Sequence, residues 1–466
     1  MPLPIGRLFA VAILAPATLL AQASAPARPD FKSLRFDESW SAAQRSPKLD
    51  DAIKAIPLAP QLSLTLGGQA RWRDEFVSAF QLADRSDTYG QSRVQVHADL
   101  QAGDRKGFNG RVFAELRDAQ SYGRDLPGGA RVSDADRTDA QNLFVDLGYQ
   151  RSFVRAGRQE VVTGRERLIG VPDWSNTRRG FEGVRAVLVR GPFAIDAIDA
   201  RPVVVRIDAA NRSDTSTRLV GAGVGSAPGA KALARGLPAT WQVYRYEQHI
   251  AAASVTHRIT TGGRALWSLP AASATAPVLS VELEGAVQRG RSGVRALEAW
   301  FAVAEVQAQW RAVRGAPSLA LGTDLASGDA NGADSVATAF NMLYTAAHAH
   351  GGYADVIGRA NARETRLVGT WSPWGPLSAR AAWHRFDRLT LADGAYTKQN
   401  TVLRAASGST ARHVADEFDL TLQYSATRHL RVIAGHAWVL PGAFLEQTPG
   451  GALAERWAFI GTTLTF

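Results

Sequence analysis

Arginine is the residue in this sequence whose spacing most clearly indicates chemistry. In LSLTLGGQARWRDEF, residues 62–76, Arg71 and Arg73 are two positions apart, so that in a strand both guanidinium groups lie on one face and Trp72 lies on the other. Guanidinium groups bind carboxylates and phosphates through paired hydrogen bonds. A wet surface that carries several of them is therefore suited to an anionic solute, provided that the fold brings such faces together.

The same alternation of polar and apolar residues recurs along the chain. In SRVQVHADLQ, residues 92–101, Arg93 and Gln95 alternate with Val94 and Val96. Charges buried inside a soluble sandwich would each need a partner, because an unpaired one costs several kcal/mol, so the polar faces must contact water. The apolar faces then need a non-aqueous neighbour. This pattern predicts the strands of a membrane barrel, with the polar residues toward a water-filled lumen.

The number and the connections of the strands agree with such a barrel. We count about eighteen strand-like stretches, an even number as a single-chain bacterial barrel requires, and TRLVGAGVG, residues 217–225, is the weakest of them. Short turns alternate with long loops, except near 226–239 and 269–277, and the chain ends in an amphipathic strand with Phe466 on its apolar side. We predict an all-β fold, a monomeric transmembrane antiparallel β-barrel with short periplasmic turns and long extracellular loops. A soluble secreted β-protein is the alternative.

The N-terminus indicates the compartment. Arg7 precedes an apolar run that ends near a small-residue cleavage site, so residues 1–23 are predicted to be a cleaved signal peptide. We expect residues 24–60 to form a periplasmic N-terminal segment, either a tether or a plug, and residues 61–466 to form a barrel in the outer membrane of a Gram-negative cell.

Several other functions are disfavoured by the sequence. The chain has no cysteine and a net charge of +10, but its basic residues interleave with acidic ones, which argues against nucleic acid as a partner. It contains neither a nucleophile elbow nor a zinc-protease motif. The HAH motif at 348–350 and DANGAD at 329–334 are weak metal signatures. We therefore expect no enzyme activity, no cofactor and no metal.

The alternation itself assigns residues to the lumen. Each of them could simply pair with a neighbouring strand and keep the wall rigid, but together they form a guanidinium-rich wall with interspersed carboxylates. The predicted pore-lining residues are Arg71, Arg73, Arg93, Arg117, Arg155, Arg185, Arg366, Arg380, Glu115, Asp146, Asp196, Asp324, Glu417 and Asp419.

Several segments in order resemble the alginate-export family of outer-membrane channels, which are monomeric barrels of about eighteen strands. They run from KAIPLAPQLSLTLGGQARWRDEF through AGRQEVVTGRERLIGVPDWSNTRRGFEGVRA, GTDLASGDANG and FNMLYTAAHAHGGYADVIG to DEFDLTLQYSATRHLRVIAGHAWVLPGAF. The resemblance covers most of the chain and is specific for the family, although not for alginate as the solute.

The resemblance implies a positively charged constriction that passes a polyuronate. By position it extends to Arg71, Arg73, Arg155, Arg158, Gln159, Arg179, Arg185, Asp324 and Asp329. Strict alternation sets Arg158 opposite Arg155, so either a bulge intervenes or one of them faces outward near the rim. The loop at 340–353 departs from the family by having Met342 and Thr345 where two prolines are expected.

The sequence thus predicts passive diffusion of an anionic solute, an alginate-like uronate saccharide, through an arginine-rich lumen. A general porin or a small organic-acid porin on the same barrel is the alternative. The expected partners are outer-membrane lipid, an anionic saccharide or other carboxylated solute, and periplasmic export or uptake machinery.

Overall fold

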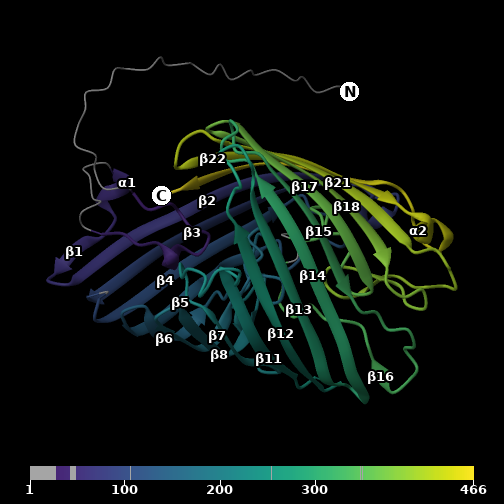
Figure 1. The fold of residues 1–466 in the computed structure, drawn as a ribbon, viewed down its shortest axis with the longest axis horizontal. Coiled ribbons are helices and arrows are strands. Elements are labelled where there is room, and N and C mark those ends of the chain that lie inside the picture. The colour runs from purple at the N-terminus through teal and green to yellow at the C-terminus, as the bar shows by residue number, and fades with distance from the viewer. Residues whose placement is uncertain (1–27, 42–48, 105, 253, 347, 349) are drawn as a thin grey trace.

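The computed structural model describes residues 28–466 apart from 42–48, 105, 253, 347 and 349. The predicted signal peptide lies outside these residues. In the described part the chain forms a closed antiparallel barrel of 18 strands (Figure 1). No helix of that part is long and apolar enough to cross a membrane.

The barrel strands follow one another in chain order, and the last pairs with the first. They are β2 (Leu62–Ser78), β3 (Asp87–Gly103), β4 (Phe108–Tyr122), β5 (Asp136–Tyr149), β6 (Ser152–Gln159), β7 (Phe181–Arg190), β8 (Phe193–Val204), β10 (Thr217–Ser226), β11 (Thr240–Ile250), β12 (Thr256–Leu269), β13 (Val278–Ser292), β14 (Arg295–Gln309), β15 (Ser318–Ala326), β17 (Ala362–Trp374), β18 (Leu377–Arg388), β21 (His413–Ser425), β22 (Leu430–Pro441) and β23 (Glu455–Thr465). The barrel closes where β2 and β23 pair antiparallel, from Gln69 opposite Thr465 to Ser78 opposite Arg456. The weakest predicted strand, residues 217–225, is confirmed as β10.

The remaining elements are short and lie at the two ends of the barrel. They are the helical turns η1 (Arg35–Asp37), α1 (Leu49–Ala52), η3 (Phe80–Leu82) and α2 (Ala443–Gln447), and the strands β1 (Ile56–Ala59), β9 (Arg212–Ser213), β16 (Val336–Ala337), β19 (Ala395–Tyr396) and β20 (Val402–Arg404). Figure 1 shows β1 and the C-terminus at one end, with α2 and β16 at the other.

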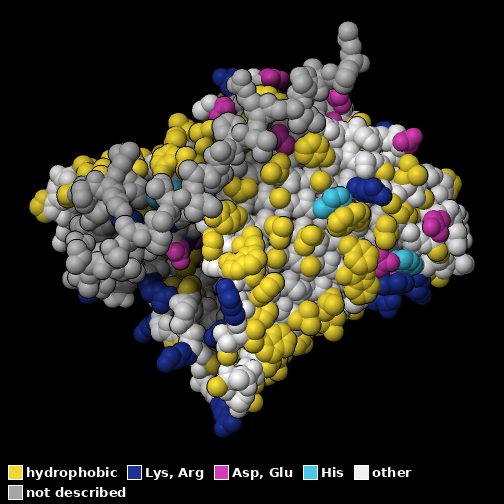
Figure 2. Space-filling model, turned by 90° about the horizontal axis from the view of Figure 1, so that it is seen from above, with side chains coloured by type: hydrophobic (Ala, Val, Ile, Leu, Met, Phe, Trp, Pro, Cys, Tyr) yellow, Lys and Arg dark blue, Asp and Glu magenta, His cyan; other side chains and the backbone are white. Residues whose placement is uncertain are grey.

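The polar and apolar residues that alternate along each strand face the inside and the outside of the barrel, respectively. On β2, Trp72 is 44% exposed and Phe76 is also exposed, whereas Arg73 between them is only 3% exposed. Hydrophobic side chains spread across the outer wall, and most of the visible charged side chains lie toward its edges (Figure 2). An apolar outer band with a polar interior is the pattern of a transmembrane barrel.

Two long connections fold back into the barrel. They are the β6–β7 connection, residues 160–180, called here loop 160–180, and the β15–β17 connection, residues 327–361, called loop 327–361. Ile169 of the first and Phe340 of the second are fully buried in one hydrophobic cluster with Leu219 and Phe301 of the wall. The core of this protein therefore lies inside the barrel, where the loops meet the inner wall.

Residues 28–41, called from here on the N-terminal segment, also enter the barrel, at the mouth on the side of the short turns, which the sequence predicts to be the periplasmic one. Phe36 is buried between Phe113 of β4 and Phe144 of β5, with ring centroids 5.7 and 5.3 Å away. Arg35 donates hydrogen bonds to the carbonyl oxygens of Gly68 and Phe466, beside the seam that closes the barrel. Residues 28–41 therefore lie inside the mouth of the barrel, and the two roles expected for residues 24–60, a tether or a plug, stay predictions.

Candidate functional site: a loop-bearing lumen

An arginine cluster on the inner wall holds loop 160–180. We define the cluster as Arg71 and Arg73 of β2, Arg93 of β3 and Arg178 of the loop itself. Arg71 and Arg93 lie directly opposite each other on paired strands, so that their guanidinium groups reach the same part of the lumen. Because Arg71, Arg73 and Arg93 come from paired strands, these three residues hold their donors in place for the loop.

The donors of the cluster bind the backbone of the loop. Arg71 donates to the carbonyl oxygens of Asp173 at 2.8 Å and Trp174 at 3.2 Å, and Arg73 donates to that of Trp174 at 2.8 Å. The Trp174 ring lies 3.8 Å from the guanidinium carbon of Arg73, a close cation–π contact. The strand arginines predicted to line the pore therefore serve first to anchor a loop within it.

One carboxylate, that of Asp173, is bound among these guanidinium groups. Its Oδ1 lies 2.9 Å from Arg93 Nη2 and 3.0 Å from Arg178 Nη1, yet the side chain remains 46% exposed. Burial alone would raise the pKa of the Asp173 carboxyl, but Arg93, Arg178 and Arg71 together hold that pKa well below its usual range. Asp173 thus remains ionised, and the lumen already binds a carboxylate through two arginines.

The arginines of the cluster differ in whether they form ion pairs with carboxylates. Arg73 pairs with Glu75 at 2.6 Å and Arg178 pairs with Glu160 at 2.7 Å. Burial opposes the charge of Arg178, but Glu160 and Asp173 raise its pKa above the ordinary value. Within the described part of the chain, Arg71 forms no ion pair and has only neutral oxygens as partners.

Loop 327–361 is anchored on another part of the wall, where carboxylates of the wall accept hydrogen bonds from backbone N–H groups of the loop. The backbone N–H of Ala354 donates to Glu417 Oε1 at 2.7 Å, and that of Tyr353 donates to Asp419 Oδ2 at 3.2 Å, both carboxylates belonging to β21. Lys398 from the β18–β21 connection pairs with Asp355 at 2.6 Å. Burial would raise the pKa of the Asp355 carboxyl, but Lys398 and His348 hold it well below its usual range.

The two loops also bind each other across the lumen. The Tyr344 N–H donates to the Leu168 carbonyl at 2.8 Å, and the Gly170 N–H donates to the Tyr344 carbonyl at 3.0 Å. Arg179 donates to the Thr345 carbonyl at 3.1 Å, and burial lowers the pKa of Arg179 to about 10. Guanidinium groups thus bind the carbonyls of loop 160–180, and carboxylates bind the amides of loop 327–361. The two loops meet inside the barrel through the hydrogen bonds between them, at a place called here the constriction.

Below the constriction, a row of charges lines the periplasmic half of the lumen. Arg155 lies directly opposite Asp146 on one side and Arg185 on the other. Arg155 binds Asp146 through two hydrogen bonds of 2.8 and 2.9 Å, and Arg185 binds Asp196 in the same way at 2.9 and 2.7 Å. These planar paired contacts keep the guanidinium groups fixed on the wall.

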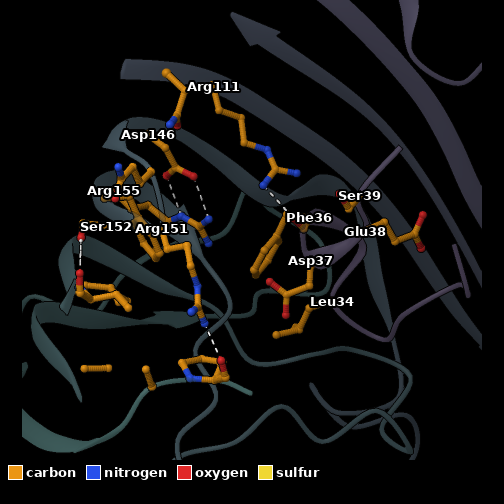
Figure 3. A pocket seen from close by; sticks show the side chains of 18 of the residues that line it. Leu34, Phe36, Asp37, Glu38, Ser39, Arg111, Asp146, Arg151, Ser152 and Arg155 are labelled. Carbon is orange, nitrogen blue, oxygen red and sulfur yellow. Dashed lines mark hydrogen bonds and ion pairs between the residues drawn. The ribbon is translucent and has the colours of Figure 1, made fainter. Parts of the chain in front are cut away.

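This row faces a cavity of about 1230 Å³ beside the N-terminal segment (Figure 3). The Asp37 carboxylate of the segment lines the cavity and makes no hydrogen bond or ion pair with any described residue, whereas the Asp37 backbone N–H donates to the Leu34 carbonyl at 2.9 Å. Burial raises the pKa of the Asp37 carboxyl, although Arg155, Lys32 and Arg185 oppose the shift. Charged side chains of the inner wall therefore line a cavity at the periplasmic mouth.

The other predicted lining residues face the interior and are paired, as the simpler interpretation of the alternation supposed. Arg117 pairs with Asp136, Glu115 accepts a hydrogen bond from Gln95, Arg366 pairs with Asp324 and Glu305, and Arg380 approaches Asp419 at 3.9 Å. Charge pairing along the inner wall is thus general among these residues.

Arg158 is an exception, and its predicted position in the lumen needs correction. It lies directly opposite Leu143, which is 54% exposed on the outer face, and it pairs with Asp139 and Glu182 near the loop end of the strand. No bulge shifts the β5–β6 register, so the second expectation holds, in which one of the two arginines faces outward. Gly157 beside it has φ of +130°, and a Cβ there would lie 2.3 Å from the Leu143 carbonyl oxygen.

The motifs that resembled metal sites are occupied by other contacts. His348 Nδ1 lies 3.1 Å from Asp355 Oδ2, whereas His350 Nε2 lies 2.6 Å from the carbonyl oxygen of Arg165, so the two imidazoles diverge. Burial and the charge of Arg359 hold the pKa of His350 well below its ordinary value. In the 329–334 loop, Arg295 pairs with both Asp329 and Asp334.

Sequence reasoning missed the residues of loop 160–180 that complete the constriction, although the segment that contains them was part of the family resemblance. Asn176 is fully buried, and its amide donates to the carbonyl oxygens of Ser92 at 2.8 Å and Gln120 at 3.0 Å while its Oδ1 accepts from Arg71. A polar residue in a loop has no periodicity that could have indicated such a role.

Replacing Asn176 with alanine is expected to loosen the loop without changing any charge. Two strand carbonyls and the Arg71 guanidinium would lose a buried partner, at a cost of roughly 1–3 kcal/mol. Single-channel recordings should then show more frequent current flicker than the unaltered protein. An Asn109→Ala variant, which changes a side chain at a periplasmic turn, is the control, and flicker equal to this control would argue against an anchoring role.

Comparison with known proteins agrees with the architecture. Three crystal structures from Pseudomonas aeruginosa are similar: OccK5 (OpdH), with a TM-score of 0.53 and 12% identity over 86% of this chain and 98% of that one; OccD3 (OpdP), with 0.57 and 10% over 86% and 91%; and the outer membrane protein OpdK, with 0.57 and 12% over 86% and 99%. At such identities the likeness shows the fold alone. No curated protein matches the chain.

The family comparison goes further. The model of the family described as alginate export matches residues 62–459, which is almost the whole barrel. The family and the barrel architecture both support an outer-membrane channel. The chain belongs to the alginate export family.

Proposed function

We propose that this channel passes anionic solutes by passive diffusion, and that its solute is an alginate-like uronate saccharide. The observation that supports this most directly is the half-exposed Asp173 carboxylate bound by Arg93 and Arg178. A uronate presents the same group on each sugar ring. Donors that hold a resident carboxylate in this way can exchange it for the carboxylate of a passing solute.

The resident carboxylate also explains how a polyanion could pass without being trapped. Asp173 competes with the solute for the same guanidinium groups, which lowers the affinity of any one site. Conduction requires sites that are favourable enough to reach and weak enough to leave. Arg155 and Arg185 in the periplasmic half would offer further contacts of the same kind, each already balanced by an aspartate.

A small organic acid is the second candidate solute. It is favoured by the two loops that bind each other across the lumen, through hydrogen bonds such as that from the Tyr344 N–H to the Leu168 carbonyl at 2.8 Å. In this arrangement a small carboxylate passes more readily than a saccharide chain. A monomeric barrel and a periplasmic export or uptake partner remain predictions.

Block of the small-ion current distinguishes these solutes. The small-ion current through the purified protein in a planar bilayer is recorded before and after addition of uronate oligomers, neutral glucose oligomers of equal length or a small dicarboxylate. We expect reversible block by the uronate oligomers and little by the neutral ones. Block by the dicarboxylate alone would support the organic-acid alternative, and equal block by uronate and neutral oligomers would contradict recognition of an anion.

A further inference from the structure

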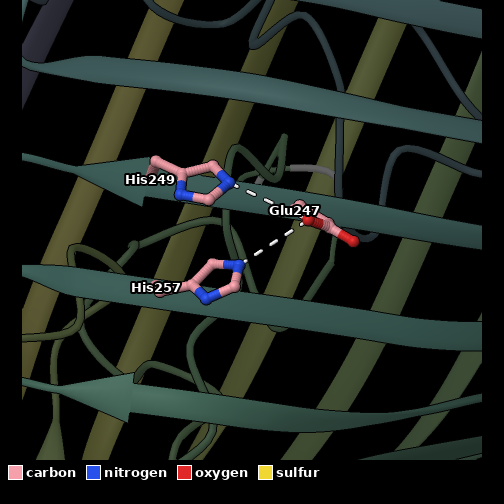
Figure 4. Close-up of side chains that lie close together, drawn as sticks. All are labelled: Glu247, His249 and His257. Atoms are coloured by element: carbon pink, nitrogen blue, oxygen red, sulfur yellow. Dashed lines mark ion pairs between the residues drawn. The ribbon is translucent and has the colours of Figure 1, made fainter.

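Three potential metal ligands gather outside the lumen, on the outer face of β11 and β12 (Figure 4). His249 of β11 and His257 of β12 are direct partners across the two strands, and their rings stack at 4.3 Å with an angle of 15° between them. Glu247 lies two residues before His249 and therefore on the same face. Val243 of the same strand face is 54% exposed, which marks this face as the outer one.

The donor atoms converge on one point. Glu247 Oε2 lies 3.8 Å from His249 Nε2 and 3.6 Å from His257 Nε2, and all three atoms lie within 4.8 Å of one another. In a tetrahedral zinc site with bonds near 2.1 Å, ligand atoms are separated by about 3.4 Å. The two distances to Glu247 Oε2 exceed this separation by about 0.4 and 0.2 Å, and the donor atoms as a group by at most about 1.4 Å, so side-chain rotations could bring them to ligand distance.

Neighbouring contacts leave one oxygen of the Glu247 carboxylate and one nitrogen of the His257 imidazole available for metal binding. Arg245 donates to Glu247 Oε1 at 3.1 and 2.9 Å, which orients the carboxylate and leaves Oε2 directed at the imidazoles. His257 Nε2 is shielded from solvent and has no hydrogen-bond partner among the described residues. Its distance of 3.6 Å to Oε2 exceeds hydrogen-bond length. A cation between the two groups would satisfy both.

We propose that Glu247, His249 and His257 form a binding site for a transition-metal cation of the Zn²⁺ class on the outer surface of the barrel. Two imidazoles and one carboxylate are ligands that this class prefers. The side chains are 32%, 49% and 41% exposed, so a fourth position is open to an oxygen donor from the surroundings. The bound cation would join β11 to β12 close to the end of β11 at Ile250 and the start of β12 at Thr256.

The site can be tested on the full chain, folded in detergent and without a histidine tag. Zn²⁺ titration by calorimetry should give saturable binding of a single ion per barrel, and Co²⁺ should give the strong visible absorption of a tetrahedral site. His249→Gln and His257→Gln should each weaken Zn²⁺ binding by at least about tenfold, the scale of lost site contacts. His436→Gln is the matched control, because His436 is also an outward imidazole, opposite the exposed Leu420, but it stacks on Trp438 and pairs with no carboxylate among the described residues.

The possible results of these titrations distinguish a metal site from a surface cluster that binds no metal. Absence of saturable Zn²⁺ binding, or equal loss of binding in the His436→Gln control, would overturn the proposal. If a histidine variant does not fold, Glu247→Gln keeps both imidazoles and the strand pairing and should still weaken binding. Unchanged Zn²⁺ affinity in Glu247→Gln would reduce the cluster to a surface ion pair between the carboxylate and the imidazoles.

Discussion

Replacing Arg71 and Arg93 with glutamine is expected to abolish most of the anion selectivity of the channel. In a water-filled lumen a guanidinium group at about 6 Å stabilises a monovalent anion by roughly 0.7 kcal/mol, a factor of about three in its occupancy. Removing two such groups should lower the anion occupancy by roughly tenfold, and the anion-to-cation permeability ratio by at least as much, because the same charges repel cations. The ratio is measured from the reversal potential of the variant in a salt gradient.

Both residues also anchor loop 160–180, so the effect of losing their charge must be distinguished from the effect of losing the hydrogen bonds that hold the loop. The Asn176→Ala variant loosens the same loop and leaves every charge in place, because Asn176 binds Arg71 and two strand carbonyls. Arg71→Lys keeps the positive charge but removes the planar set of N–H donors of the guanidinium group. Both variants should remain anion-selective, and a loss of selectivity in either would mean that loop position, not charge, sets the preference.

The second large effect is expected at the periplasmic mouth. Phe36→Ala removes the ring that packs between Phe113 and Phe144 and under the Arg155 guanidinium at 4.4 Å. Truncating a buried phenylalanine costs roughly 3–5 kcal/mol. Such a cost shifts the equilibrium between the inserted and the released N-terminal segment by roughly a hundredfold or more. The segment should leave the mouth, and single-channel conductance should rise severalfold.

The matched control is Phe108→Ala, which removes a ring that is 81% exposed on the outer face near the same end of the barrel. It should leave the conductance unchanged. If Phe36→Ala conducts like the control, the N-terminal segment either remains in place without this ring or does not narrow the path, and the plug interpretation would be withdrawn.

The barrel could be predicted from sequence because its rule is local. Trp72 and Arg73 are neighbours with opposite environments, 44% and 3% exposed, and a period of two alone assigns them to the two faces. The same rule separated the outward Arg158 from the inward Arg155, although the family resemblance had suggested a lumen position for both. Here the backbone pattern was the better guide.

The constriction could not be predicted in this way, because its contacts join loops to distant strands. Asp173 and Arg93 are 80 residues apart, and no periodicity relates them. The ion pairs of the inner wall show the same limit. Alternation placed Arg366 and Asp324 on the inside, but only the pairing of β15 with β17 makes them partners at 2.7 Å. His249 and His257 likewise become neighbours only through the register of β11 on β12.

The central claim is that the lumen prefers anions, and the reversal potential of the unaltered protein tests it most directly. The purified channel in a planar bilayer separates two potassium chloride solutions of different concentration, and the voltage at zero current is read. We predict a potential with the sign of a chloride-selective pore. A potential with the opposite sign, or a bilayer that stays closed to both ions, would contradict the account.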